Sequence, residues 1–481
     1  MGFLTLIGVP LLTSVGCLFS RDDRQAERVN LLGALLTFVN AAVFAGGVLS
    51  SGPRGAWGGF FYADALSAFL MLIVTFLSLV SAHYSVDYMR HETQGGLTWY
   101  YALFHGFTAT MLLTTVANNL GVLWIAIEAT TLASTFLVGF QRSRHAVEAA
   151  WKYIILCTVG IAFALLGTFL FYFASAASGA PTLAWTELAA RAGQLDPGFV
   201  RLGFLLVLFG YGTKAGLAPM HTWLPDAHSQ APTPVSALLS GVLIKCSLCG
   251  LLRFHILACR ALGPEFSGNL LLAFGLISLV VATPFILVQR DFKRLLAYHS
   301  VEHIGIVAVG LGFGGFWGVY GAMLHLLNHA LAKALLFLSV GDVARGFGTK
   351  RMHRISGVIK AMPLTGALFF AGALALAGVP PFGLFVSEFV VVAAGMSSGH
   401  PKACALFVAL VAVILAGLLH HVMPVAFGEP KRALAAPQRG LAAAPLVLMA
   451  AILLVLGLTL PGPLDRTLAA IAGIVVGGAH G

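Results

Sequence analysis

The chain has 481 residues, of which 59% are hydrophobic and only 10% charged, and its mean hydropathy is +0.92. Soluble domains carry about 25% charged residues, so this composition excludes an ordinary soluble protein and indicates an integral membrane protein. The net charge of +10 does not indicate nucleic-acid binding, because the basic residues are scattered through short loops and form no groove-sized patch.

Apolar runs follow one another along nearly the whole chain. A helix needs about 20 residues to cross a hydrocarbon layer, so we expect an all-α polytopic membrane protein with about fourteen transmembrane helices. The run 363–396 is interrupted near Pro381, as one broken helix or two short ones, and the segment after Leu464 is too short to cross and is expected at the surface. The expected spans are 3–20, 29–50, 62–83, 97–117, 119–140, 147–176, 199–220, 232–257, 268–288, 296–312, 316–343, 363–396, 402–427 and 441–461.

Lys and Arg are distributed unevenly between the two sides of this helix map. Of the 28 such residues, 17 lie in alternate connections starting with the first, against 7 on the opposite side. Because cytoplasmic connections carry the excess of Lys and Arg, both termini are expected on the non-cytoplasmic side. The expected location is a bacterial inner membrane.

Two breaks in the apolar runs are related by an internal repeat. The segments Gly216 to Leu224 and Gly378 to Val386 share Gly and Pro at matching offsets, 162 residues apart. Paired broken helices in the two halves of a transporter commonly mark an ion pathway near the bilayer midplane. Because an odd number of expected spans separates the breaks, the two halves should have opposite orientations in the membrane.

Charged residues inside the apolar runs are the main functional candidates. Each costs about 2.5–3.5 kcal/mol at the centre of a membrane helix on insertion scales. Lys214 and Lys245 flank the first break, Glu128 lies deep in its own run, and Glu388 follows the second break. Glu128 is either hydrogen-bonded to a neighbouring helix or paired with Lys214 for proton exchange. Glu388 is either a relay group or a carboxylate at the N-terminus of a half-helix.

Histidines extend this set. His325, His329 and Lys333 are spaced at i, i+4 and i+8, which places them on one helix face. A second helix face consists of His299, Glu302 and His303. It lies near the expected cytoplasmic end of its span and is either a proton entry path or a solvated helix end. His221 and His228, in and after the first break, are further candidates for the entry path, although either can be a structural residue.

The sequence indicates no chemistry on covalent bonds. It contains no Walker motif and no nucleophile with a matching base. A zinc site is not expected, because no other carboxylate or cysteine cluster is evident to complete four ligands, and Cys246 and Cys249 form a lone CxxC. We therefore expect no cofactor in this chain.

Three stretches resemble the antiporter-like subunits, a family that includes the proton-conducting membrane subunits of respiratory complex I, Mrp-type cation/proton antiporters and membrane-bound hydrogenases. They are Lys214 to Lys245, His325-x-x-x-His329-x-x-x-Lys333, and Gly378 to Phe389. Two further stretches, Glu128 to Tyr153 and Ala297 to Gly305, are most similar to component F of hydrogenase 4. The resemblance covers essentially the whole chain.

This resemblance implies fourteen helices that hold two inverted five-helix half-channels. The implied divisions are 1–96, with helices 1–3; 97–260, the first half-channel; 261–430, the second half-channel; and 431–481, with helix 14 and the tail. The implied proton relay along the midplane consists of Glu128, Lys214, Lys245, His325, His329, Lys333 and Glu388.

The expected function is proton translocation within a hydrogenase- or complex I-like assembly, with the redox cofactors and catalysis in partner membrane subunits. Protons would enter from the cytoplasm, load the Lys214/Glu128 pair through Lys245, pass along the second-half histidines and Lys333, and leave near Glu388. The alternative is the ion-conducting subunit of a non-redox transporter, such as an Mrp-type antiporter or an inorganic-carbon uptake system. The abundance of histidine and the lack of a hard-oxygen cage favour H⁺ over Na⁺.

Overall fold

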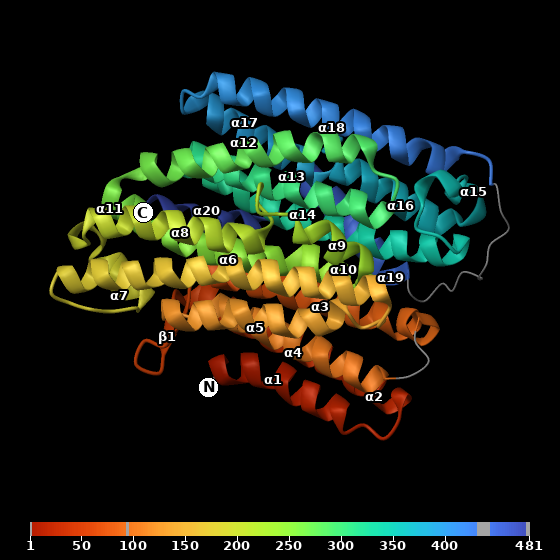
Figure 1. Cartoon of the computed structure of the whole chain (residues 1–481), viewed down its shortest axis with the longest axis horizontal. Helices are drawn as coiled ribbons and strands as arrows, with labels where there is room; N and C mark the ends of the chain where they lie inside the picture. The colour runs from red at the N-terminus through yellow and green to blue at the C-terminus, as the bar shows by residue number, and fades with distance from the viewer. Residues whose placement is uncertain (1, 93–95, 431–442, 478–481) are drawn as a thin grey trace.

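The computed structural model describes residues 2–92, 96–430 and 443–477. Within these ranges the chain is a bundle of long helices lying side by side, with one small β-hairpin at one end of the bundle (Figure 1). The hairpin pairs β1 (Arg54–Ala56) with β2 (Phe61–Ala63) in antiparallel register. The predicted all-α polytopic class is confirmed.

The helices of the first half of the chain follow the expected order. Side-chain caps explain several of their starts: Asn119, Ser143 and Asp196 each accept a hydrogen bond from a backbone N–H in the first turn that follows. These helices are α1 (Gly2–Leu18), α2 (Asp23–Ser51), α3 (Ala65–Glu92), α4 (Leu97–Val116), α5 (Leu120–Val138), α6 (Arg144–Ala177), α7 (Trp185–Ala190), η1 (Ala192–Gln194), α8 (Pro197–Ala215), α9 (Trp223–Gln230), α10 (Thr233–Leu238), the π-helical turn η2 (Leu239–Leu243) and α11 (Ile244–Leu262).

The second half begins with two long helices that pack closely on each other. They are α12 (Pro264–Val288) and α13 (Phe292–Phe313), the latter capped by Asp291. The remaining elements are α14 (Gly315–Phe347), η3 (Met352–Arg354), α15 (Val358–Ala361), α16 (Pro363–Leu376), α17 (Gly383–Ser397), α18 (Pro401–Phe427), α19 (Ala444–Leu458) and α20 (Gly462–Val476).

The predicted helix map agrees with these elements. Among the described residues, ten helices are long and apolar enough to cross a membrane, or eleven if the bent pair α19–α20 counts as one span. The other expected spans correspond to α1, α4 and the pair α16–α17, which are shorter or less apolar. Each of the fourteen expected spans therefore has a counterpart, whereas the four divisions of the chain stay a prediction.

Helix α20 differs from the expectation of a surface segment after Leu464. It bends by 72° from α19, and Leu468 and Ile471 on one of its faces are fully buried against the bundle. Tyr320 on α14 donates a hydrogen bond to Asp465 at 2.6 Å. The prediction of a surface location is therefore wrong for this face, because an apolar helix face too short to span can still pack on a neighbouring helix.

Both predicted helix breaks are present at their expected positions. Helix α8 ends at Ala215 and the chain turns through Gly216, whose φ is +85°. The second break separates α16 from α17 and turns through Gly378, with φ of +65°, so this run is two short helices. Only glycine adopts such φ values without strain, which explains glycine at both positions.

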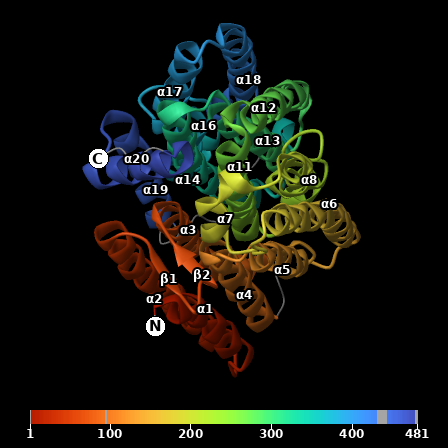
Figure 2. The same ribbon diagram turned by 90° about the vertical axis from the view of Figure 1, so that its left-hand side faces the viewer.

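The helices that carry most candidate residues lie at the centre of the bundle. Figure 2 views the bundle along its helices and places α11, α13 and α14 inside, with α1–α2 and α17–α18 at opposite edges. In their most apolar windows, 94% of residues in α13 and in α14 are buried, against 28% in peripheral α18. Charges carried by α13 and α14 are therefore shielded from lipid by protein.

Candidate functional site

Lys214 occupies the last turn of α8, where the chain breaks. Its side chain is fully buried, and Nζ donates hydrogen bonds to Thr131 Oγ1 at 2.9 Å and to the Tyr153 hydroxyl at 2.5 Å. Nζ also lies 4.5 Å from the centre of the Tyr153 ring. The partial negative charge at a helix C-terminus favours a cation there. Two hydroxyls, one aromatic face and a helix end thus accommodate the buried ammonium.

Glu128 is connected to Lys214 through Thr131. The Thr131 hydroxyl donates to Glu128 Oε2 at 3.3 Å, and Thr158 donates to Oε1 at 2.8 Å. Glu128 is only partly buried, between α5 and the exposed Thr158 of α6. Glu128 therefore has the expected hydrogen bond to a neighbouring helix, through Thr158, while the Thr131 hydroxyl bridges it to Lys214. Proton exchange between Glu128 and Lys214 stays a prediction.

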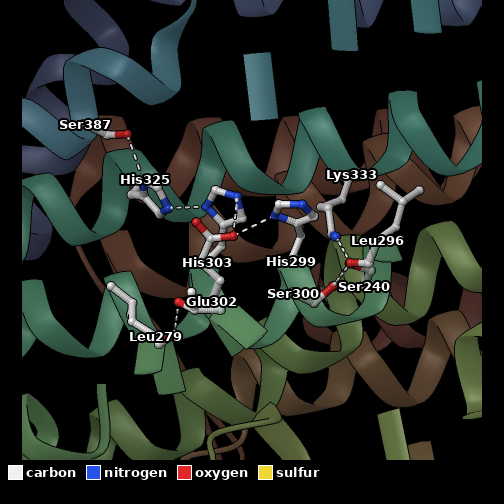
Figure 3. Close-up of polar contacts among 11 residues, drawn as sticks. Ser240, Leu279, Leu296, His299, Ser300, Glu302, His303, His325, Lys333 and Ser387 are labelled. Carbon is white, nitrogen blue, oxygen red and sulfur yellow. Dashed lines mark hydrogen bonds and ion pairs between the residues drawn. The ribbon is translucent and has the colours of Figure 1, made fainter. Parts of the chain in front are cut away.

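Lys245 and Lys333 belong to one chain of polar contacts. The π-helical turn η2 precedes Lys245, whose Nζ donates to the Ser240 carbonyl at 2.5 Å. The Ser240 hydroxyl lies 2.8 Å from that of Ser300, which donates to the Leu296 carbonyl at 3.2 Å. Lys333 also donates to this carbonyl (Figure 3). The Ser240–Ser300 hydrogen bond thus lies between the two buried lysines, each of which donates to a backbone carbonyl.

The histidines of α13 and α14 form a buried cluster (Figure 3). His303 Nδ1 lies 2.9 Å from His325 Nε2, and His325 Nδ1 lies 3.0 Å from the Ser387 hydroxyl on α17. The ring of His329 stacks on that of His303 with centroids 4.7 Å apart, and neither of its nitrogens has a hydrogen-bond partner. The sequence predicted the His325–His329–Lys333 face, and the structure adds His303 to it.

His299, Glu302 and His303 face the interior. Their exposed fractions are 1%, 3% and 0%, and His299 Nδ1 lies 2.7 Å from Glu302 Oε2. The alternative of a solvated helix end is therefore wrong, because the neighbouring helices α12 and α14 pack against α13 and these three side chains are buried. Whether the three residues form an entry path stays a prediction.

Glu388 lies close to the same cluster. One donor atom from each of Glu388, His303 and His325 lies within 4.8 Å of the others. The second break therefore delivers its carboxylate to the histidines of α13 and α14, across helices that are distant in sequence. The sequence did not show Glu388 beside His303 and His325, because the spacing along one helix does not reveal what a third helix brings to it.

His221 and His228 are buried near the first break. His221 packs edge-on against Tyr298, with ring centroids 6.1 Å apart. His228 stacks on Phe337 at 5.3 Å, and neither of its nitrogens has a hydrogen-bond partner. Tyr298 belongs to α13 and Phe337 to α14, so both histidines contact the central helices, and their role in proton entry stays a prediction.

The sequence alone did not identify several residues of the site. Lys293, expected in a cytoplasmic connection, is 1% exposed and donates to the Ala231 carbonyl at 2.9 Å. The bridging hydroxyls of Thr131, Tyr153 and Ser300 carry no sequence signal, since Ser, Thr and Tyr occur throughout these helices. By contrast, the i, i+4 spacing of Glu148 and Lys152 in the sequence does indicate their ion pair, whose N–O distance is 2.7 Å.

These features define a class of polytopic membrane subunits that have a broken helix in each half and a row of buried lysines and histidines between the breaks. Residues 117–415 match the family described as NADH:quinone oxidoreductase/Mrp antiporter, TM, and residues 60–101 match the complex I chain 5 N-terminus family. The chain belongs to the NADH:quinone oxidoreductase/Mrp antiporter family, since the match covers more than half of it.

Individual relatives agree with this family. The chain is 37% identical over 434 residues to a hydrogenase-4 component F homolog of Methylacidiphilum infernorum, covering 88% of this chain and 89% of the relative. It is 33% identical to NADH-quinone oxidoreductase subunit N of Desulforudis audaxviator, covering 73% and 69% of the two chains.

Solved structures share the fold. A chain of an archaeal membrane-bound sulfane sulfur reductase superposes with a TM-score of 0.90 at 25% identity, over 98% of this chain and 97% of that one. A chain of respiratory complex I from Thermus thermophilus gives 0.79 at 26% identity, over 94% and 97%. A chain of the Mrp complex from Dietzia gives 0.87 at 23% identity, which is a likeness of fold alone.

Proposed function

We propose that this chain is the proton-translocating membrane subunit of a multi-subunit redox complex of the hydrogenase or complex I type. The observation that carries the proposal is the row of fully buried lysines, Lys214, Lys245 and Lys333, each held by hydroxyls or carbonyls inside the bundle. Buried membrane charges are costly, and their usual role is in an ion pathway. The names of the relatives, a hydrogenase component and a quinone oxidoreductase subunit, support the same function.

The proposed route uses these contacts as steps. In the first half, Lys214 exchanges protons with Glu128 through the Thr131 hydroxyl. In the centre, Lys245 and Lys333 each donate to a backbone carbonyl beside the Ser240–Ser300 hydrogen bond, and the two lysines influence each other through their charges. In the second half, the histidines lead towards Glu388 at the second break. Redox chemistry belongs to partner subunits, whose conformational changes shift protons along the row.

The test is redox-driven proton uptake in vesicles that contain the intact complex. Lys214→Ala should abolish uptake, because it removes the charge that links the first break to Glu128, while electron transfer by the complex shows that it is assembled. The matched control is Lys402→Ala, which removes an exposed lysine at the start of α18 and should pump normally. Normal pumping by the Lys214→Ala complex would rule out the proposed role.

The alternative is an ion-conducting subunit outside any redox chain, as in an Mrp-type antiporter. It is supported by 30% identity over 349 residues to one subunit of the Na⁺/H⁺ antiporter of Alkalihalophilus pseudofirmus, of which this chain covers 42%. Gentle isolation of the native complex separates the two functions: a co-purifying hydrogenase or quinone-reducing module supports the first, and ion transport without any redox partner supports the second.

We further propose a bacterial inner membrane as the location, with both termini on the non-cytoplasmic side. The excess of Lys and Arg in alternate connections supports this orientation. Alkaline phosphatase fused after Gly481 should be active in cells, since it folds only outside the cytoplasm, and an inactive, stably produced fusion would reverse the orientation.

A further inference from the structure

Three side chains from three helices converge near the second break, and a fourth, His329, stacks on one of them. Donor atoms of His303 on α13, His325 on α14 and Glu388 on α17 lie within 4.8 Å of one another. Around a tetrahedral zinc ion with bonds of about 2.0–2.1 Å, neighbouring ligand atoms stand about 3.4 Å apart. Side-chain shifts of about 1 Å would therefore bring these three groups onto one ion without moving the helices.

The pair His303–His325 is already spaced for a shared ion. His303 Nδ1 and His325 Nε2 are 2.9 Å apart, so a proton lies between them. A metal ion would replace this proton and separate the two nitrogens by about 0.5 Å. The other nitrogen of His325 lies 3.0 Å from the Ser387 hydroxyl, which orients the ring in the way that outer contacts orient metal-binding histidines.

His329 supplies the independent observation. Its ring centroid lies 4.7 Å from that of His303, it is fully buried, and both of its nitrogens lack hydrogen-bond partners. A buried polar group without a partner destabilises the fold. His329 therefore lies beside His303, with its ring centroid 6.5 Å from that of His325, so a rotation of its side chain towards the cluster is needed for it to become the fourth ligand.

We propose that His303, His325, His329 and Glu388 form a binding site for a zinc-class divalent ion inside the bundle. Three imidazoles and one carboxylate match the ligand preference of Zn²⁺ and exclude Mg²⁺ and Ca²⁺, which require oxygen ligands. Glu302, whose Oε2 lies 3.9 Å from His303 Nε2, flanks the site. Metal binding at this site does not depend on the proposed function. Inhibition of proton translocation by the bound ion, in contrast, rests on the proposed function.

The test uses the purified full chain in detergent, stripped with a chelator and loaded with Zn²⁺ alone. After gel filtration the wild-type chain should retain one zinc that His303→Gln/His325→Gln loses, with affinity reduced about 100-fold in competition with a chromophoric chelator. Zinc X-ray absorption of the loaded wild-type chain should show imidazole ligands. Glu388→Gln, a conservative change, should weaken binding about 10-fold and guards against misfolding of the double variant.

Two control variants distinguish this site from other histidines. His105→Gln alters a buried histidine that bonds Asn30 at 3.0 Å, far from the cluster, and should leave zinc binding unchanged. His420→Gln/His421→Gln removes histidines that line a surface pocket together with His353, and should also bind normally. Thermal unfolding shows whether the two cluster variants are folded. The proposal is overturned if these variants, when folded, retain zinc as the wild type does. It is also overturned if only the surface variant loses zinc, which would indicate an adventitious ion only.

Discussion

Thr131 is the residue on which contact between Lys214 and Glu128 depends. Its hydroxyl accepts from the ammonium and donates to the carboxylate, so one oxygen orders both charges. A hydrogen bond to a charged group contributes about 1.5–3 kcal/mol, and 1.4 kcal/mol corresponds to a tenfold change in rate. Loss of the Thr131 hydroxyl should therefore slow proton transfer between Lys214 and Glu128 strongly, although threonine itself does not ionise.

We expect Thr131→Val to slow redox-driven proton uptake about tenfold or more, because it keeps the shape of the side chain and removes the bridging oxygen. Initial uptake rates in vesicles of the intact complex measure this, normalised to electron transfer. The matched control is Thr135→Val, one turn further along α5, whose hydroxyl bonds only the Thr131 carbonyl at 2.7 Å. Equal rates for the two variants would show that protons do not cross at Thr131.

At the scale of single elements, the breaks followed from sequence and the π-helical turn did not. Gly and Pro at matching offsets indicated both breaks, because glycine tolerates the left-handed backbone that ends α8 and α16. Nothing in Leu239-Ser240-Gly241-Val242-Leu243 distinguishes a π-helical from an α-helical turn. This turn packs against α14 and α3, and tertiary packing of this kind cannot be read from local periodicity.

Gly378 connects the second break to Glu388. A Cβ atom at this position would lie 3.0 Å from Glu388 Oε1, and closer still to Oε2. In Gly378→Ala the left-handed backbone, with φ of +65°, costs about 1–2 kcal/mol. The added Cβ atom also clashes with the Glu388 carboxylate. We expect this variant to lose most proton uptake because Glu388 is displaced from His303 and His325.

The matched control for this prediction is Gly399→Ala. Gly399 also has a left-handed backbone, with φ of +81°, but nothing lies within 4 Å of an added Cβ. Both variants should lower the thermal unfolding temperature by a few degrees, roughly in line with their shared strain. Loss of uptake in Gly378→Ala alone would assign the effect to Glu388, whereas equal loss in both would assign it to strain.

At the scale of the whole molecule, composition and hydropathy predicted the class and the helix map, and the motifs predicted most of the ionisable groups. What the sequence could not provide were contacts between helices distant in sequence: Glu388 beside His303, Thr131 between Lys214 and Glu128, and α20 against α14. Periodicity along one helix defines which residues share a face, but it does not show which other helix packs against that face in the folded bundle. For the same reason the sequence did not reveal that a carboxylate lies beside the second-half histidines.

A buried ion pair joins the N-terminal helices to the centre of the bundle. Asp64, which caps α3 by accepting from the Ser67 N–H at 3.0 Å, binds both terminal nitrogens of Arg253 on α11 at 2.6 and 2.8 Å. The Arg253 guanidinium also lies 4.4 Å from the Trp185 ring. The side chains of Arg253 and Asp64 are 8% and 1% exposed. If one of them is removed, water does not reach the remaining charge to take its place.

Breaking this pair should destabilise the chain far more than its net contribution suggests. Arg253→Met leaves a buried carboxylate unpaired and should cost about 3–5 kcal/mol, whereas Arg253→Met/Asp64→Asn removes both charges and should recover most of that loss. Removing an exposed pair, Lys360–Glu429, with side chains 57% and 83% exposed, should cost about 0–1 kcal/mol. Thermal unfolding of the purified variants in detergent measures all three. If the double variant were as unstable as Arg253→Met, the arginine would act through its contacts with Trp185 and Ser67 and not through charge pairing with Asp64.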